Sequence, residues 1–145
     1  MKYLLLVITL ILTPSISFAG APATSDSGYV YCDGGDRSQI KYAVIDDATS
    51  GNNTIVAAVT GKKIRVLSYT IIPAGDVTVR FESGAGGTAL TGQMNLLAED
   101  GVVSQSLSVN CAPFGCFETA AAALLNLELS GAVSVDGHLT YVECR

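Results

Sequence analysis

The segment spanning residues 62–82 constrains the fold more than any other part of the chain. Its second half, VTVRFE at residues 77–82, alternates apolar and polar side chains, the pattern of a β-strand with one buried face. Its first half is apolar, but the alternation changes phase near Leu67 and Ser68, which predicts a β-bulge or a strand buried on both faces. The turn residues PAGD at 73–76 separate the halves, so the segment predicts a long central β-hairpin.

The rest of the chain repeats this pattern of short apolar runs and turns. We count about nine to eleven β-rich runs with turn residues every eight to twelve positions, and no convincing amphipathic helix. The run LNLEL at residues 125–129 alternates cleanly, and Asp136-Gly137 between two further runs predicts a tight hairpin. The fold class is therefore predicted to be all-β, with a single antiparallel β-sandwich or jelly-roll-like domain at residues 29–145.

The beginning of the chain has the features of a secretory signal peptide. Met1-Lys2 is basic, residues 4–12 are apolar, and small residues surround Ala19. The apolar run is roughly half of the ~20 residues that a membrane span needs, which argues against an anchor. We predict a signal peptide at residues 1–19, a flexible leader at 20–28, no membrane span after cleavage, and a secreted, periplasmic or extracellular location.

The charge balance argues against nucleic acid as a partner. The chain carries 8 Lys and Arg against 13 Asp and Glu, a net charge of -5, whereas nucleic-acid binding needs clustered positive charge. Lys62, Lys63 and Arg65 form the one basic cluster, and we expect it to be the solvated start of a strand.

The four cysteines predict two disulfides. An even number in an exported chain allows three pairings, and we favour Cys32–Cys144 and Cys111–Cys116. The first bridge would tie the first strand of the domain to the last. Zinc is the alternative, but the paired C-x-x-C spacing of zinc sites is absent, so we expect no cofactor.

Candidate ligand-binding residues are aromatic or acidic. The strand tyrosines Tyr29, Tyr42 and Tyr69 could line a shallow site for a glycan or small ligand, although strand tyrosines commonly pack or cap sheet edges. Four aspartates could supply oxygen ligands to calcium if loops brought them together, although aspartate is also an ordinary turn residue. These calcium candidates are Asp33, Asp36, Asp46 and Asp47.

Nothing in the sequence indicates a catalytic site. His138 is the one histidine, and the turn chemistry of Asp136 already explains the nearest carboxylate. No G-x-S-x-G elbow or recognisable metal motif occurs. We therefore predict no catalytic residues and a protein that is not an enzyme.

Three short patterns carry a resemblance to a known group. They are GKKIRV at residues 61–66, RFESG at 80–84 and GHLTYV at 137–142, within stretches 53–92 and 117–144. In these stretches, over half of the chain after the signal, the sequence resembles small β-rich structural proteins of tailed phages and prophages. The resemblance implies a decoration, head-fibre or tail-associated domain that is jelly-roll-like and often oligomeric. The signal peptide and cysteines depart from that group, which suggests an exported relative.

Together these observations predict a non-enzymatic structural or adhesive module that acts by self-assembly or surface recognition. The expected partners are further copies of the chain, and a cell-surface or virion partner. The alternative is an extracellular module that binds a glycan or small ligand, with or without calcium.

Overall fold

A computed structural model describes residues 28–104 and 115–145 of the chain. The predicted signal peptide and nearly all of the predicted leader lie outside these residues. The described part is all-β, as predicted, and contains no helix long and apolar enough to cross a membrane. The strands are β1 Tyr29–Tyr31, β2 Arg37–Gln39, β3 Lys41–Asp47, β4 Gly51–Val56, β5 Lys63–Pro73, β6 Val77–Ser83, β7 Thr88–Ala89, β8 Met94–Leu96, β9 Val102–Ser104, β10 Phe117–Glu118, β11 Leu125–Leu129 and β12 Val135–Cys144.

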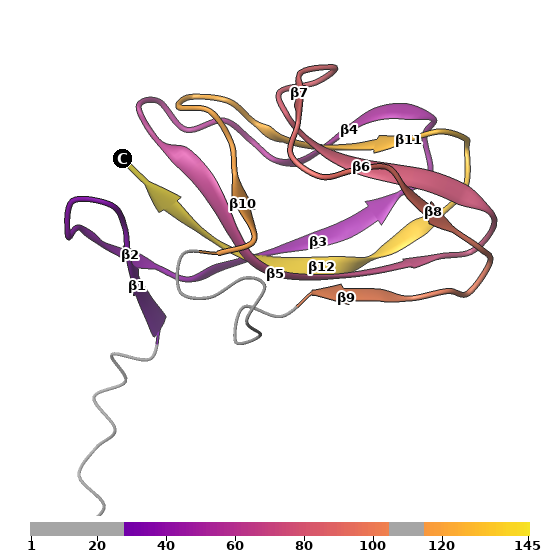
Figure 1. Cartoon of the computed structure of the whole chain (residues 1–145), viewed down its shortest axis with the longest axis horizontal. Coiled ribbons are helices and arrows are strands. Elements are labelled where there is room, and N and C mark those ends of the chain that lie inside the picture. Colours follow the sequence, from indigo (N-terminus) through magenta and orange to yellow (C-terminus); the bar gives the residue numbers. More distant parts are fainter. Residues whose placement is uncertain (1–27, 105–114) are drawn as a thin grey trace, which may run out of the picture.

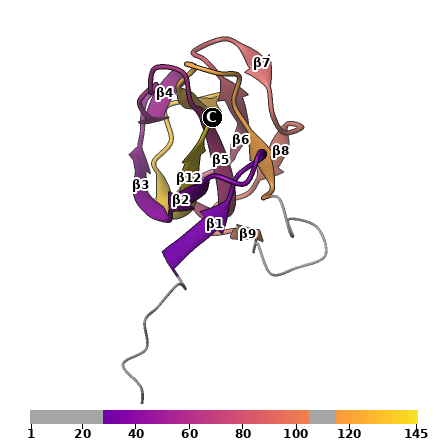
Figure 2. The same ribbon diagram turned by 90° about the vertical axis from the view of Figure 1, so that its left-hand side faces the viewer.

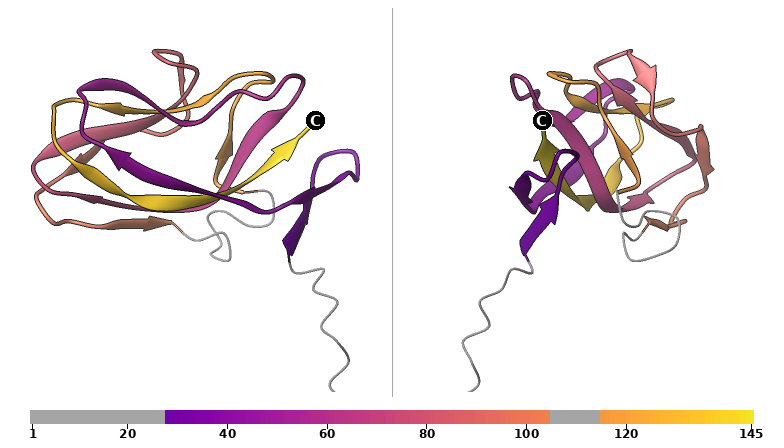
Figure 3. Two further views of the ribbon diagram at one scale, coloured as in Figure 1. Left: turned by 180° about the vertical axis from the view of Figure 1, so that it is seen from behind. Right: turned by 60° about the vertical axis from the view of Figure 1, so that its left-hand side comes forward.

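Ten of these strands form two five-stranded antiparallel sheets that lie face to face, a β-sandwich-like arrangement (Figures 1 and 2). Sheet B has the order β10-β5-β12-β3, and β9 pairs with β5 on the same side as β10. Sheet C has the order β4-β11-β6-β7, and β8 also pairs with β6. The small hairpin of β1 and β2 projects from one end of the two layers (Figure 3).

The predicted central hairpin was wrong, although both of its strands are present. β5 lies in sheet B beside β12, whereas β6 lies in sheet C beside β11. Residues 73–76 form a corner that carries the chain from one sheet to the other. The backbone N–H of Ala74 and the carbonyl of Pro73 pair there with Ser134 and Glu99. An alternating sequence shows only which face of a strand is buried. Two strands that face one core from opposite sheets show the same alternation as two strands paired in a hairpin.

The predicted irregularity near Leu67 is confirmed as a β-bulge. Ser68 pairs with Thr140 and Val66 pairs with Tyr141, which leaves Leu67 as the extra residue of β5. The bulge turns Leu67 away from the main core into a second buried cluster with Cys32, Val142 and Cys144. The change of phase in the sequence therefore reports a real change in which side of β5 is buried.

Asp136 and Gly137 do not form the predicted turn. They lie inside β12, which runs without interruption from Val135 and pairs on both sides. Gly137 is required because the strand passes close to the Thr70 carbonyl, which a Cβ atom would overlap. The neighbouring strand β11 is confirmed with the predicted bounds.

Replacing Gly137 with alanine is expected to lower the free energy of unfolding by about 2 kcal/mol, because the new methyl group must displace backbone. Chemical denaturation measures the change. Gly92→Ala is the matched control, since an added Cβ there meets nothing within 4 Å. Equal stability of the two variants would show that β12 relaxes around the methyl group.

The main core lies between the two sheets and is built from their inward-facing residues. An aromatic cluster occupies its centre, with ring centroids 5.1 Å apart for Tyr69 and Phe81 and 5.0 Å apart for Phe81 and Phe117. Phe81 is completely buried, and leucines of β11 and isoleucines of β5 surround the cluster. The outward faces of both sheets therefore remain to present functional side chains.

Candidate functional site

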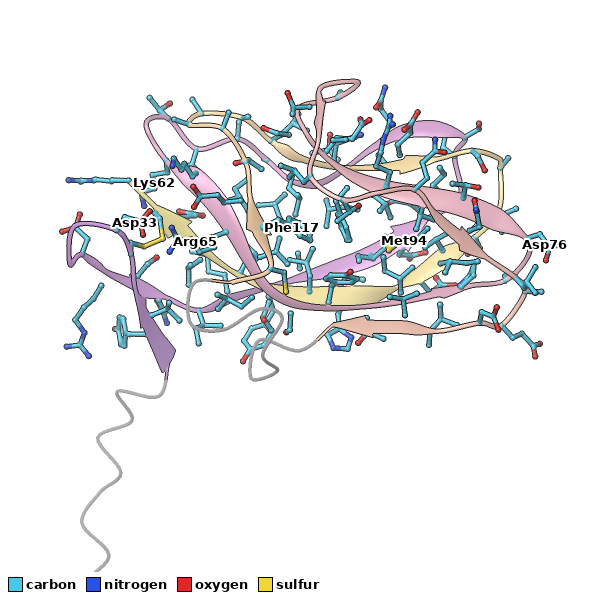
Figure 4. All side chains as sticks on the ribbon, in the orientation of Figure 1. Asp33, Lys62, Arg65, Asp76, Met94 and Phe117 are labelled. Atoms are coloured by element: carbon cyan, nitrogen blue, oxygen red, sulfur yellow. A yellow bond between two sulfur atoms is a disulfide. The ribbon has the colours of Figure 1, made fainter. Side chains whose placement is uncertain are left out.

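The end of the molecule that carries the β1–β2 hairpin combines a disulfide, several ion pairs and a polar cleft. A disulfide joins Cys32, just after β1, to Cys144 at the end of β12, with their Cα atoms 5.4 Å apart. This pairing is the one predicted from the sequence. It holds the hairpin against the ends of β5 and β12 (Figure 4).

A polar cleft of about 400 Å³ opens between this hairpin and the sheet B strand ends. That volume lies within the ~300–1,000 Å³ range of small-ligand sites. Four basic and two acidic side chains line it, a net side-chain charge of +2 in a protein whose side chains sum to -5. The lining residues are Cys32, Asp36, Arg37, Ser38, Gln39, Lys41, Lys62, Glu143 and Arg145.

Glu143 of β12 organises the basic side chains of the cleft. Its carboxylate accepts hydrogen bonds from Lys41 Nζ at 2.5 Å and Lys62 Nζ at 3.3 Å. The hydrogen bond from Lys41 lowers the pKa of Glu143 and raises that of Lys41. Ser38 donates its hydroxyl to the Glu143 carbonyl at 3.0 Å, so β2 is fixed to the same residue. Glu143 thus holds two lysines together in the lining of the cleft.

A buried arginine forms ion pairs with two carboxylates at the same end of the molecule. Arg65 is only 5% exposed, and its Nη2 donates to Glu118 at 2.8 Å and to Asp33 at 2.9 Å. Burial of Glu118 opposes its ionisation, but hydrogen bonds from Lys63 and Arg65 outweigh that effect and lower its pKa. Arg65 Nη1 is buried without a hydrogen-bond partner among the described residues. The basic cluster predicted to be solvated is therefore divided: Arg65 is structural, and Lys62 lines the cleft.

The ion pairs at this end predict a loss of stability in acid. Glu143 and Glu118 both have lowered pKa values in the folded protein, so they stabilise it above about pH 4.5 and cease to do so as pH falls through their folded values. Asp47 has the opposite sign, because burial and then the charge of Asp46 raise its pKa. Chemical denaturation across this pH range measures the slope. Glu143→Gln should reduce the slope, and an unchanged slope would contradict the role of Glu143.

Charge is distributed unevenly along the molecule. Six of the seven described basic residues lie at the disulfide end, and Arg80 on β6 is the exception. The opposite end carries carboxylates on the ends of β3 and β12 and on the turns after β5 and β8 (Asp46, Asp47, Asp76, Glu99, Asp100 and Asp136). Figure 4 shows this polarity, with Lys62 and Arg65 at one end and Asp76 at the other.

The three candidate tyrosines do not form one site. Tyr29 is 48% exposed beside the cleft, with the Arg37 guanidinium 5.1 Å from its ring centroid. Tyr42 is 76% exposed on the outward face of β3. Tyr69 is buried in the aromatic core, so its assignment to a ligand site was wrong. A tyrosine on a strand has a side chain suited to either face, and only the bulge in β5 decides which one Tyr69 takes.

The four calcium candidates are also separated. Asp33 and Asp36 lie at the disulfide end, where Asp33 binds Arg65, whereas Asp46 and Asp47 lie at the opposite end of β3. No group of three or more His, Cys, Asp or Glu side chains positioned for a metal is found in residues 28–104 and 115–145. These aspartates do not assemble a shared calcium site.

Other titratable side chains lie outside the cleft. His138 lies on the outward face of β12 between Val44 and Thr70. The adjacent glutamates Glu82 and Glu128 on sheet C share the Arg80 guanidinium, and Glu82 is almost fully buried. The predicted partner of Cys116, Cys111, lies outside the described residues, so that disulfide stays a prediction.

Sequence reasoning missed the cleft itself. Arg37, Lys41, Glu143 and Arg145 have no local motif, and Lys41 and Glu143 are separated by 102 positions in the sequence. The signal that could have helped was the predicted disulfide, which brings residues 32 and 144 together. Comparison with known proteins adds no identification, because no protein-family model matches the chain and a search of curated proteins finds no relative.

Proposed function

We propose that this chain is an exported, non-enzymatic adhesive or structural module that recognises an anionic surface through the basic cleft. The cleft supports this proposal most directly, because an acidic protein concentrates its cations around one concave site. Long-range attraction to an anionic polymer would then act on one end of the molecule. The disulfide supports an exported location, since such bridges persist in oxidising surroundings.

The order of the strands supports a jelly roll as the finer description of the fold. When β7 with β8 and β9 with β10 are each taken as one broken strand, the sheets have the orders β3-β12-β5-β9/β10 and β4-β11-β6-β7/β8. Along the chain the strands then alternate between the two sheets, except that β6 and the broken strand β7/β8 both lie in sheet C. This order is the one expected for an eight-stranded jelly roll, a fold of viral capsid and lectin domains. It agrees with the resemblance to phage structural proteins, and with a virion or cell surface as the partner.

An acidic polysaccharide is the ligand class that the cleft fits best. Its carboxylate or sulfate groups would meet Lys62 and Arg37, while Ser38, Gln39 and the exposed ring of Tyr29 offer hydrogen bonds and an apolar face to the sugar. The glycan-binding module that the sequence predicted as the alternative is therefore part of this proposal. The proposed binding does not use calcium.

Binding to an immobilised polyuronate, with neutral dextran as the comparison, tests the proposal. We expect binding to the polyuronate alone, weakening as salt rises. Lys62→Gln should weaken it by about three- to tenfold, whereas Lys63→Gln should leave it unchanged. The two lysines are equally exposed, at 35% and 36%, but Lys63 pairs with Glu118 outside the cleft. Equal binding to both polymers, or equal effects of the two variants, would refute the role of the cleft.

A further inference from the structure

Strand β3 presents a long, regular and unprotected edge of sheet B. It pairs with β12 over seven consecutive positions without a register shift, and it is the last strand in the order of the sheet. Its free edge therefore exposes backbone N–H and C=O groups that no strand of the described chain pairs. Such an edge is a template for pairing with another chain.

Other edge strands are short or interrupted. β7 and β10 have two residues each and β8 has three, while β4 on the edge of sheet C begins at Gly51 and is interrupted by a bulge at Ile55. These are common ways of preventing edge-to-edge association. β3 instead exposes Tyr42 and Val44 to 76% and 74% at its centre. Its only charged residues are Lys41 at the start and Asp46 and Asp47 at the end.

The sequence of β3, KYAVIDD, is complementary to itself when two copies run antiparallel. Pairing about Val44 places Lys41 of one copy opposite Asp47 of the second copy, Ala43 opposite Ile45, and Val44 opposite Val44. Opposite charges directly across an antiparallel pair stabilise it, as do facing β-branched residues. Parallel pairing in register would instead place Lys41 against Lys41 and Asp47 against Asp47. The edge therefore favours one orientation.

The charge of the whole molecule favours the same orientation. β3 runs from the basic cleft, which Lys41 lines, to the acidic end that includes Asp46, Asp47 and Asp136. In an antiparallel pair, the basic end of each copy lies beside the acidic end of the other. Complementary potentials of this kind steer association and fix register. Lys41 can retain its bond to Glu143, because an ammonium group has three donor hydrogens.

We propose that β3 binds β3 of a second copy of this chain about a twofold axis through Val44, which joins two copies of sheet B into one continuous sheet. The interface is isologous and closes at two copies, because each β3 has one free edge. This inference is independent of the ligand of the cleft. It gives the expected homo-oligomer a defined size and a defined contact.

Light scattering of the purified protein over a range of concentrations tests the proposal, together with hydrogen exchange of the β3 amides. We expect a dimer whose β3 amides are protected. Val44→Lys should raise its dissociation constant by at least about tenfold, because two ammonium groups would face each other at the axis. Leu97→Lys is the control, since it also replaces an exposed apolar side chain with lysine, at a residue 62% exposed in the connection after β8.

Exchanging the charges of Lys41 and Asp47 distinguishes the loss of this specific ion pair from a general effect of net charge on association. Lys41→Asp and Asp47→Lys should each weaken the dimer, and the double variant should restore it. Circular dichroism would establish that each variant is folded. A monomer at all concentrations, a trimer, or a dimer that tolerates Val44→Lys would overturn the proposal. So would a double variant no better than the single ones.

Discussion

Replacing Cys32 and Cys144 together with alanine is expected to lower the free energy of unfolding by about 4 kcal/mol. The bridge joins residues 112 positions apart, so it closes a loop that includes almost the whole domain and restricts the unfolded chain strongly. Against a total stability of about 5–15 kcal/mol for an ordinary domain, this loss is large. Chemical denaturation of the two proteins under oxidising conditions measures the difference.

The same substitution should affect the cleft more than the main core. Cys32 and Cys144 belong to the small buried cluster with Leu67 and Val142, which is distinct from the core between the sheets. Without the bridge, the β1–β2 hairpin can open locally while the sheets remain paired. We therefore expect faster hydrogen exchange in β2 and weaker polyuronate binding, with little change in the exchange of β11.

Alanine substitution is a sharper test than reduction. A reductant would act on every disulfide, whereas the double variant leaves the predicted Cys111–Cys116 bridge unchanged. If the variant matched the parent protein in stability, the chain-entropy account of this bridge would be wrong. If it retained full polyuronate binding, the hairpin would not be needed to form the cleft.

The sequence predicted individual strands well and their partners poorly. The alternation at residues 125–129 located β11 to the residue, and the phase change at Leu67 located the bulge. Both are local patterns, in which side chains report which face of one strand is buried. The predicted hairpin at residues 73–76 failed because a turn motif does not specify whether the next strand enters the same sheet. That choice depends on how the two layers close around one core. The one at Gly137 failed because Asp-Gly also fits inside a strand that passes close to another backbone.

The site was less predictable than the fold for a related reason. Lys41 on β3, Lys62 just before β5 and Glu143 on β12 are far apart in the sequence, and nothing in their local sequence distinguishes them from ordinary surface charges. Arg65 was expected in solvent because it belongs to a cluster of basic residues at the start of a strand. Its burial depends on Glu118 and Asp33, which approach it only in the folded protein. Electrostatic sites built across strands therefore become visible only once the topology is known.

Replacing Phe81 with alanine is expected to lower the free energy of unfolding by about 3–5 kcal/mol. Its side chain is fully buried in sheet C and contacts Tyr69 and Phe117, both of which belong to strands of sheet B. Truncation would remove the central ring that joins the two layers and leave a cavity that neither neighbour can fill without leaving its strand. Phe81→Leu is the control, and because it retains most of the volume it should cost markedly less.

Combining this substitution with the loss of the disulfide tests whether the two buried clusters are independent. Phe81 lies in the main core, whereas Cys32 and Cys144 lie in the second cluster. If the clusters share no packing, the losses in unfolding free energy should add to within about 0.5 kcal/mol. A larger deviation would mean that the disulfide end and the centre of the two sheets form one cooperative unit. The cleft could then not open unless the core loosened as well.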